Sequence, residues 1–273
     1  MAEPETEGTD ISLRAAEVVA DISETDRPQE RRRIVSTFMK AATSGTRVAT
    51  SGARVATSGA RAVGRGTRVV QRRASEGTGW LADQVVAMAP RLRVRDQAAL
   101  QAQFPGKSPD EIADALIEGA ARAAAAAGGA VGMASALPVL PAFPVEIAAE
   151  TLVLVGIELK LVAELHEAYG SPAPGKFPEQ MSAYVGAWTH RRGVFMIEGG
   201  LIFAAGSPLA RLLRRRLVAR AGRSAFSLGP MLTGAAAGAL FNRRETRRLA
   251  RDIQRDLRRQ EIEGPAKRDW WNR

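Results

Sequence analysis

The chain has no cysteine and only two histidines, His166 and His190. Without cysteine it can form no disulfide, no thiolate metal site and no cysteine nucleophile, and this usage is typical of a reducing compartment. A conventional zinc site would have to rely mainly on carboxylates, so we predict no metal and no other cofactor. The first residues, MAEPETEG, lack the basic and apolar regions of a secretory signal. We therefore expect a protein that is not secreted.

Common catalytic motifs are also missing. The sequence has no GxGxxG after a strand, no GxxxxGK[ST], no GxSxG and no HExxH. Four polar residues are nevertheless expected in apolar surroundings: Glu146, Glu150, Glu198 and His190. Buried carboxylates can act as general acids or bases, but a structural polar stripe formed by Glu146 and Glu150, paired with Arg122 or Arg191, explains them more simply. We predict no catalytic residue and no enzyme activity.

The charge of the chain is strongly positive, at +10 with a pI near 10.9. Such a charge predicts an anionic partner, either a phospholipid surface or a nucleic acid. Aromatic residues make up only 5% of the chain and Phe38 is the only one in the basic stretch 31–75, so the stretch offers no series of stacking platforms for bases. This favours an anionic membrane surface, with nucleic-acid binding or protein scaffolding as the alternative.

Charge is separated along the first third of the chain. Residues 1–30 contain nine acidic residues and two arginines, whereas 31–75 contain eleven basic residues and no acidic one. The basic part carries a seven-residue repeat, ATSGxRV, beginning at Ala42, Ala49 and Ala56. Because each copy includes glycine, serine and threonine, we predict a largely disordered charged arm over 1–77. The repeat is either a low-complexity linker or a segment that becomes helical on anionic lipid.

The remainder predicts an all-α, multi-helix bundle over 78–263, followed by a tail over 264–273. Apolar spacing indicates a helix ended by Pro90, and Ser108 with Pro109 predicts the start of another. A third is expected from about Val145 to Ala168, with its charged residues in one arc of about 100°. Glu158 is the exception, because it lies on the apolar side. Such a helix is buried in a bundle or lies deep against a membrane.

Two further segments precede the tail. The uncharged stretch Ser224 to Asn242 contains Gly229-Pro230 and Gly234-xxx-Gly238, whose small residues permit close helix packing. It is a membrane span, an embedded hairpin or a buried bundle helix, and we favour the last two. From Arg243 to about Glu261, Leu249, Ile253 and Leu257 repeat every four residues among arginines. This pattern predicts a separate basic amphipathic helix.

Arginines near these segments are the predicted contacts for lipid or another anion. They are Arg214, Arg215, Arg216, Arg220, Arg243, Arg244, Arg247 and Arg248. Trp270 and Trp271 either anchor the tail at a headgroup interface or fold back onto the core. We expect a non-enzymatic helical protein on the cytoplasmic side of a membrane, peripheral or partly embedded. A membrane-protein partner is a further possibility, and the oligomeric state stays open.

Several features follow one another in order between Ile112 and Asp256. They are Gly128-Gly129-Ala130, Leu137-Pro138-Val139-Leu140-Pro141, an acidic residue opening a long apolar helix, its Tyr169-Gly170 end, and the late Gly229-Pro230 to Asn242 segment. Together they resemble the EcsC family, although Glu146 stands where an aspartate is expected. The resemblance implies a helical, membrane-associated protein of bacterial type, and it supplies no catalytic residues.

Overall fold

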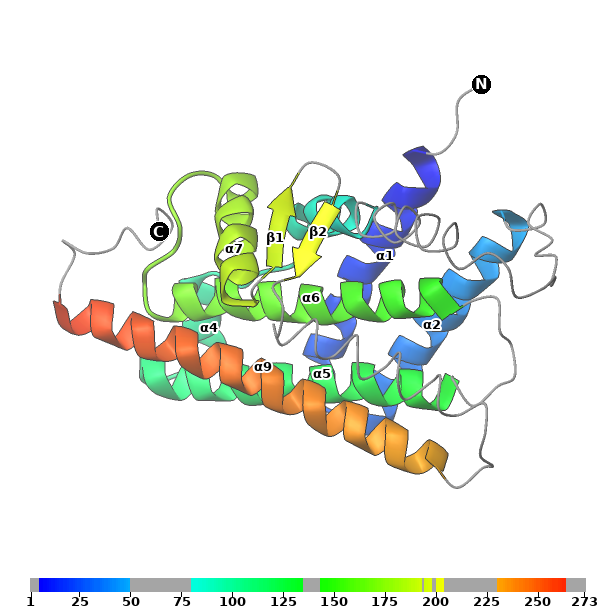
Figure 1. Cartoon of the computed structure of the whole chain (residues 1–273). Coiled ribbons are helices and arrows are strands. Elements are labelled where there is room, and N and C mark those ends of the chain that lie inside the picture. Colours follow the sequence, from blue (N-terminus) through cyan, green and yellow to red (C-terminus); the bar gives the residue numbers. More distant parts are fainter. Residues whose placement is uncertain are drawn as a thin grey trace.

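The computed structural model describes residues 5–49, 80–134, 143–192, 194–197, 200–203 and 230–263. Its elements are α1 (Glu5–Glu24), α2 (Pro28–Ala49), a helix over 80–88, η1 (Ala89–Arg91), α4 (Gln97–Gln103), α5 (Pro109–Ala134), α6 (Phe143–Ala168), α7 (Phe177–Arg192), β1 (Val194–Ile197), β2 (Gly200–Phe203) and α9 (Pro230–Glu263). The all-α prediction is confirmed (Figure 1). One short antiparallel hairpin, with Val194 opposite Phe203, adds a feature that we did not predict.

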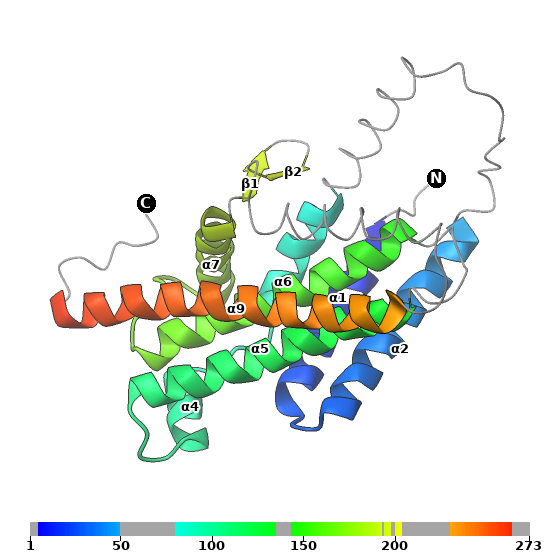
Figure 2. The same cartoon turned by 60° about the horizontal axis from the view of Figure 1, so that its bottom comes forward.

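The long helices α5, α6 and α9 form the centre of the bundle. Figures 1 and 2 show α9 lying along α5, while α1 and α2 form a hairpin that crosses α5 and α6 obliquely. Helices α5 and α9 run antiparallel, because Asp110 near the start of α5 contacts Arg258 near the end of α9. Helix α7 and the β hairpin lie on the side of α6 away from α5 (Figure 1).

Helix α6 supplies most of the core. From Ala149 to Ala168 only Glu167 is not buried, and apolar neighbours from α1, α5 and α7 pack around this segment. Of the two environments predicted for this helix, the structure shows the interior of a bundle. In the part of the chain that the structure describes, no helix is long and apolar enough to span a bilayer.

The N-terminal segment differs from our prediction of a largely disordered arm. Over residues 5–49 it forms α1 and α2, which bury Val19, Ile22, Val35 and Phe38 in the common core. The prediction for this segment was based on its charged residues. Its apolar residues, however, recur every three or four positions and so share one helix face. The rest of the predicted arm, 50–77, with most of the repeat, lies outside the described residues, as does the tail 264–273.

Local signals predicted the helix ends well. The 80–88 helix passes into η1, which contains Pro90. Helix α5 begins at Pro109 with a capping box, in which Glu111 N donates to Ser108 Oγ (3.3 Å) and Ser108 N donates to the Glu111 carboxylate (2.9 Å). Helix α6 is closed by Gly170, whose φ of +60° lies in the left-handed region that glycine tolerates.

The last helix corrects a predicted boundary. The structure has one continuous helix, α9, where we expected an uncharged segment followed by a separate amphipathic helix. Pro230 does not interrupt this helix but begins it, because the first turn needs no backbone donor from that residue. The apolar positions Leu249, Ile253 and Leu257 face the bundle and are buried, and Gly238 packs against Gly128 of α5.

His166 gives the stability of this core a pH dependence. The ring is buried in α6, with Nδ1 2.7 Å from the Val162 carbonyl oxygen and Tyr184 beside it. Burial, with a smaller contribution from the charge of Arg191, lowers the pKa of His166 from 6.5 to about 4. The unfolded chain therefore binds a proton before the folded chain does, and stability is lost as pH falls through this interval.

We expect His166→Gln to abolish this part of the pH dependence. The wild type should lose about 3 kcal/mol more than the variant as the pH falls from 6.5 to below 4. Urea unfolding of both proteins across this range measures the difference, and the carboxylates, common to both, cancel. Parallel stability curves for the two proteins would contradict a neutral, buried His166.

Candidate anion-binding surface

The arginines of α9 form two rows with different surroundings. The first row faces α5, where acidic residues recur every four positions on one helix face. Arg243 Nη2 lies 2.6 Å from Glu118 Oε1, Arg247 Nε donates to the same carboxylate at 3.1 Å, and Arg258 Nε donates to Asp110 Oδ1 at 2.5 Å. Arg251 pairs with Asp114 between them. This row is a ladder of ion pairs between two antiparallel helices.

The ladder lowers the pKa of its carboxyl groups. Hydrogen bonds from Arg247 and Arg243 outweigh partial burial and lower the pKa of Glu118. Burial raises the pKa of Asp110 and Asp114, but the combined effect of their hydrogen bonds and arginine charges leaves each pKa below its usual value. The three α5 carboxylates are therefore ionised at neutral pH and compensate the arginines that face them.

The second row consists of Arg244, Arg248, Arg255 and Arg259, all of which are exposed. At 3.6 residues per turn these positions fall within an arc of about 60°, nearly opposite the buried Leu249, Ile253 and Leu257. Apart from Arg255, which pairs with Asp252, these arginines make no hydrogen bond or ion pair within the described part of the chain. This row carries the uncompensated positive charge of α9.

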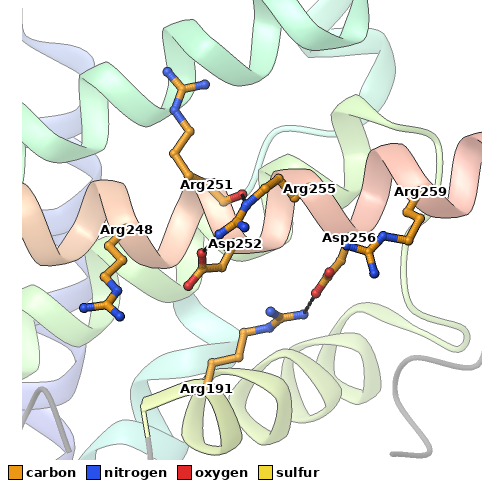
Figure 3. Close-up of a pocket in the computed structure, with 7 residues that line it drawn as sticks. All are labelled: Arg191, Arg248, Arg251, Asp252, Arg255, Asp256 and Arg259. Atoms are coloured by element: carbon orange, nitrogen blue, oxygen red, sulfur yellow. Dashed lines mark hydrogen bonds and ion pairs between the residues drawn. The ribbon is translucent and has the colours of Figure 1, made fainter.

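Part of this row lines an open groove of about 620 Å³ between α9 and α7. Figure 3 shows Arg248 and Arg259 at opposite ends of the groove, and Arg191 reaching from α7 to Asp256. The Arg191 Nη2 to Asp256 Oδ2 distance is 2.8 Å. Five arginines against two aspartates leave a formal charge of +3 on the lining. Guanidinium forks on a convex helix beside a shallow groove suit phosphate oxygens.

The predicted contact residues are distributed unevenly over this arrangement. Arg244 and Arg248 belong to the exposed row, whereas Arg243 and Arg247 face Glu118. The remaining predicted arginines, Arg214, Arg215, Arg216 and Arg220, lie outside the described residues, as do Trp270 and Trp271. Our prediction missed Arg191, Arg255 and Arg259. The spacing from Arg244 to Arg259 marks the last two in the sequence, but no sequence signal places Arg191 beside them.

The polar residues predicted in apolar surroundings also differ from one another in burial. Glu150 is buried, at 1% exposed, while the side chain of Glu146 and all of Glu198 lie outside the described residues. His190 is exposed, which corrects our expectation, because α7 turns this side chain away from the core. Arg191, proposed as a partner for the stripe, pairs with Asp256 instead.

A buried polar cluster that we did not predict joins α6, α7 and α9. Glu158 is 2% exposed and accepts hydrogen bonds from Trp188 Nε1 (2.8 Å), Arg192 Nε (2.9 Å) and Thr246 Oγ1 (3.0 Å). The position of Glu158 on the apolar side of its helix was the available signal. The carboxylate is buried and accepts hydrogen bonds from three protein side chains, so the cluster links α6, α7 and α9. These donors leave no open position on the carboxylate for a substrate.

Among the described residues, no group of three or more histidine, cysteine, aspartate or glutamate side chains is arranged to hold a metal ion. Comparison with protein-family models, with curated proteins and with solved structures finds no match. The two arginine rows of α9 are therefore the features that bear on function.

Proposed function

We propose that this protein is a non-enzymatic helical protein that associates with the cytoplasmic face of a membrane. The exposed arginine row on α9 contacts anionic headgroups. The observation that carries the proposal is the difference between the two rows: α5 compensates one, while Arg244, Arg248 and Arg259 are left exposed on a single face. The EcsC-like order of motifs supports the same class of protein, and we propose membership of that family with it.

The energetics of a peripheral contact agree with this arrangement. A basic side chain near an anionic membrane surface contributes on the order of 1 kcal/mol, and the attraction falls off within a Debye length of about 10 Å at 0.1 M salt. Several arginines on one face reach that layer together, whereas the ladder arginines are already paired. Arginines 214–216 and 220 precede α9 in the chain and would add to the contact. Binding of this kind is reversible and weakens with salt.

The same row would attract the phosphates of a nucleic acid. Base stacking, however, requires exposed aromatic rings, and among the side chains that the structure describes the exposed aromatic ones, Trp80 and Phe177, lie on other helices. The geometry of α9 thus favours a surface that presents only phosphates. A lipid headgroup layer fits this description better than a single strand of nucleic acid does.

A charge-neutral triple variant tests the proposal. Arg244→Gln, Arg248→Gln and Arg259→Gln together remove three charges that have no partner in the described part of the chain, so folding should be preserved. We expect cosedimentation with phosphatidylglycerol-containing vesicles to weaken by roughly tenfold to a hundredfold, and binding of the wild type to fall steeply with salt. Vesicles of phosphatidylcholine alone should bind neither protein.

The matched control removes the same charge from the start of α2 and the turn that precedes it. Arg27, Arg32 and Arg33 are exposed there, and their change to glutamine should leave vesicle binding nearly unchanged. An equal loss in both triple variants would mean that net charge, and not the α9 row, drives binding. If the wild-type protein does not bind anionic vesicles but binds duplex or single-stranded DNA, the membrane proposal is wrong and the nucleic-acid alternative takes its place.

A further inference from the structure

A second cavity, of about 400 Å³, lies away from the α9 groove, among α1, α2, α4, α5 and α6. Figure 2 shows the turn between α1 and α2 on the same side of α5 as α4, and residues of all these elements line the space. Its apolar wall includes Leu116, Ile157 and Leu161. The polar part of the lining is rich in cations, of which Arg31 is the most buried.

Arg31 is only 3% exposed, yet few of its donors are engaged. Its Nε donates to the Ile22 carbonyl oxygen at 3.0 Å, which links α2 to the end of α1. The nearest carboxylate oxygen, on Asp26, is 3.6 Å from Nη2, and that side chain is 93% exposed. A guanidinium carries five N–H donors. Most of those on Arg31 therefore have no partner in the described part of the chain.

Arg122 brings a second positive charge from α5 to the same cavity. Burial is the largest reason that the pKa of Arg31 is lowered, and the charge of Arg122 adds to it, while Asp26 acts in the opposite direction. Two guanidinium groups that repel each other at the wall of a cavity are costly without an anion. The arrangement becomes favourable once a bound anion accepts hydrogen bonds from both.

The other cations of the cavity already have partners. Glu164 is engaged by Arg95 Nη2 at 2.6 Å and by Lys160 Nζ at 2.6 Å, so both cations share one carboxylate partner. Glu118 is held by the α9 ladder. Arg122 makes no ion pair within the described part of the chain, and the carboxylate nearest Arg31 is that of the exposed Asp26, 3.6 Å away.

We propose that this cavity binds a phosphate group, with Arg31 and Arg122 donating hydrogen bonds to its oxygens. Planar guanidinium forks match phosphate oxygens, and the positive charges of Arg31 and Arg122 attract an anion. The phosphate belongs to a soluble compound or to a phosphatidic acid headgroup. The site is independent of the α9 row, because the two share no residue.

Thermal unfolding of the full chain with increasing inorganic phosphate tests the site, with chloride holding the ionic strength constant. We expect a saturable rise in the Tm of the wild type. Arg122→Gln removes the exposed member of the pair and should weaken phosphate binding at least tenfold, without lowering the Tm in phosphate-free buffer. Arg32→Gln is the matched control: it removes the same charge from the residue next to Arg31, which is exposed and outside the cavity, and should keep the full phosphate effect.

The opposite results overturn the proposal. These are a wild type that phosphate does not stabilise, a rise in Tm that never saturates, as expected of a salt excluded from the protein surface, or an equal effect in Arg122→Gln. The triple α9 variant should retain the phosphate response, so the failure of one proposal leaves the other standing.

Vesicles containing phosphatidic acid then distinguish the two sources of phosphate. Inorganic phosphate that displaces the wild type from these vesicles, with Arg122→Gln binding them less, identifies the headgroup. Equal vesicle binding by both proteins, alongside the saturable phosphate effect, identifies a soluble phosphate compound.

Discussion

Replacing Glu158 with alanine is expected to lower the free energy of unfolding by about 3–5 kcal/mol, the cost of removing one partner of a buried ion pair. Arg192 is 6% exposed, and its guanidinium donates to both oxygens of Glu158. The variant also removes the acceptor of the Trp188 indole N–H and of the Thr246 hydroxyl. Chemical denaturation of the wild type and the variant measures the loss.

A neighbouring pair provides the matched control. Arg191 lies next to Arg192 in α7 and pairs with Asp256, but the two side chains are 30% and 43% exposed. Because water screens this pair, Arg191→Ala should cost less than about 1 kcal/mol. Changing Glu158 and Arg192 together to leucine and methionine should restore much of the lost stability, since the buried pair is replaced as a whole and only the 3.5 Å contact of Arg192 with Glu245 is lost in addition. If Glu158→Ala were no less stable than Arg191→Ala, the Glu158 cluster would not be what stabilises the packing of α6, α7 and α9.

Changing Gly128 to alanine is expected to destabilise the protein by about 1–3 kcal/mol, as overpacking does in a filled interior. A Cβ at this position would lie 2.7 Å from Asn242 Nδ2 and 2.9 Å from the Gly238 carbonyl oxygen. The amide could shift, but the backbone oxygen belongs to α9 and moves only with that helix. The antiparallel α5–α9 contact would have to open, and the Glu118 ion pairs further along it would be strained. Thermal and urea unfolding report the effect.

Gly119 in the same helix provides a control of opposite sign. A Cβ there has nothing within 4 Å, and the residue lies inside a regular helix. Gly119→Ala should therefore stabilise the protein by about 0.5–1 kcal/mol, because alanine loses less backbone entropy on folding. If both variants shifted stability in the same direction, close packing at Gly128 would not be the cause.

Signals carried within a few residues predicted helix ends correctly. Ser108 and Glu111 bond to each other across one turn, and Gly170 closes α6 through its own backbone freedom, so neither depends on distant parts of the chain. Predictions based on charge failed where a segment makes tertiary contacts with the core. Residues 5–49 carry a strongly segregated charge, yet Val19 and Phe38 reach a core that α6 supplies.

The candidate surface shows the same division. Arginines in the last helix are evident in the sequence, and so is the i, i+4 spacing of Asp110, Asp114 and Glu118. Which arginines those carboxylates compensate depends on the antiparallel packing of α9 on α5, which joins positions more than a hundred residues apart. The buried Arg31 and the exposed Arg122 likewise come together only where α2 meets α5.

The sequence by itself determined the all-α class, the caps and ends of several helices, and the net positive charge. These properties follow from periodicity, backbone preferences and composition, which act locally or over the whole chain. Tertiary structure alone decided that the acidic segment joins the core, that Glu158 links three helices, and that α5 compensates half of the α9 arginines. The physical reason is that burial and ion pairing depend on which helix faces meet, and that choice is made by packing between distant segments.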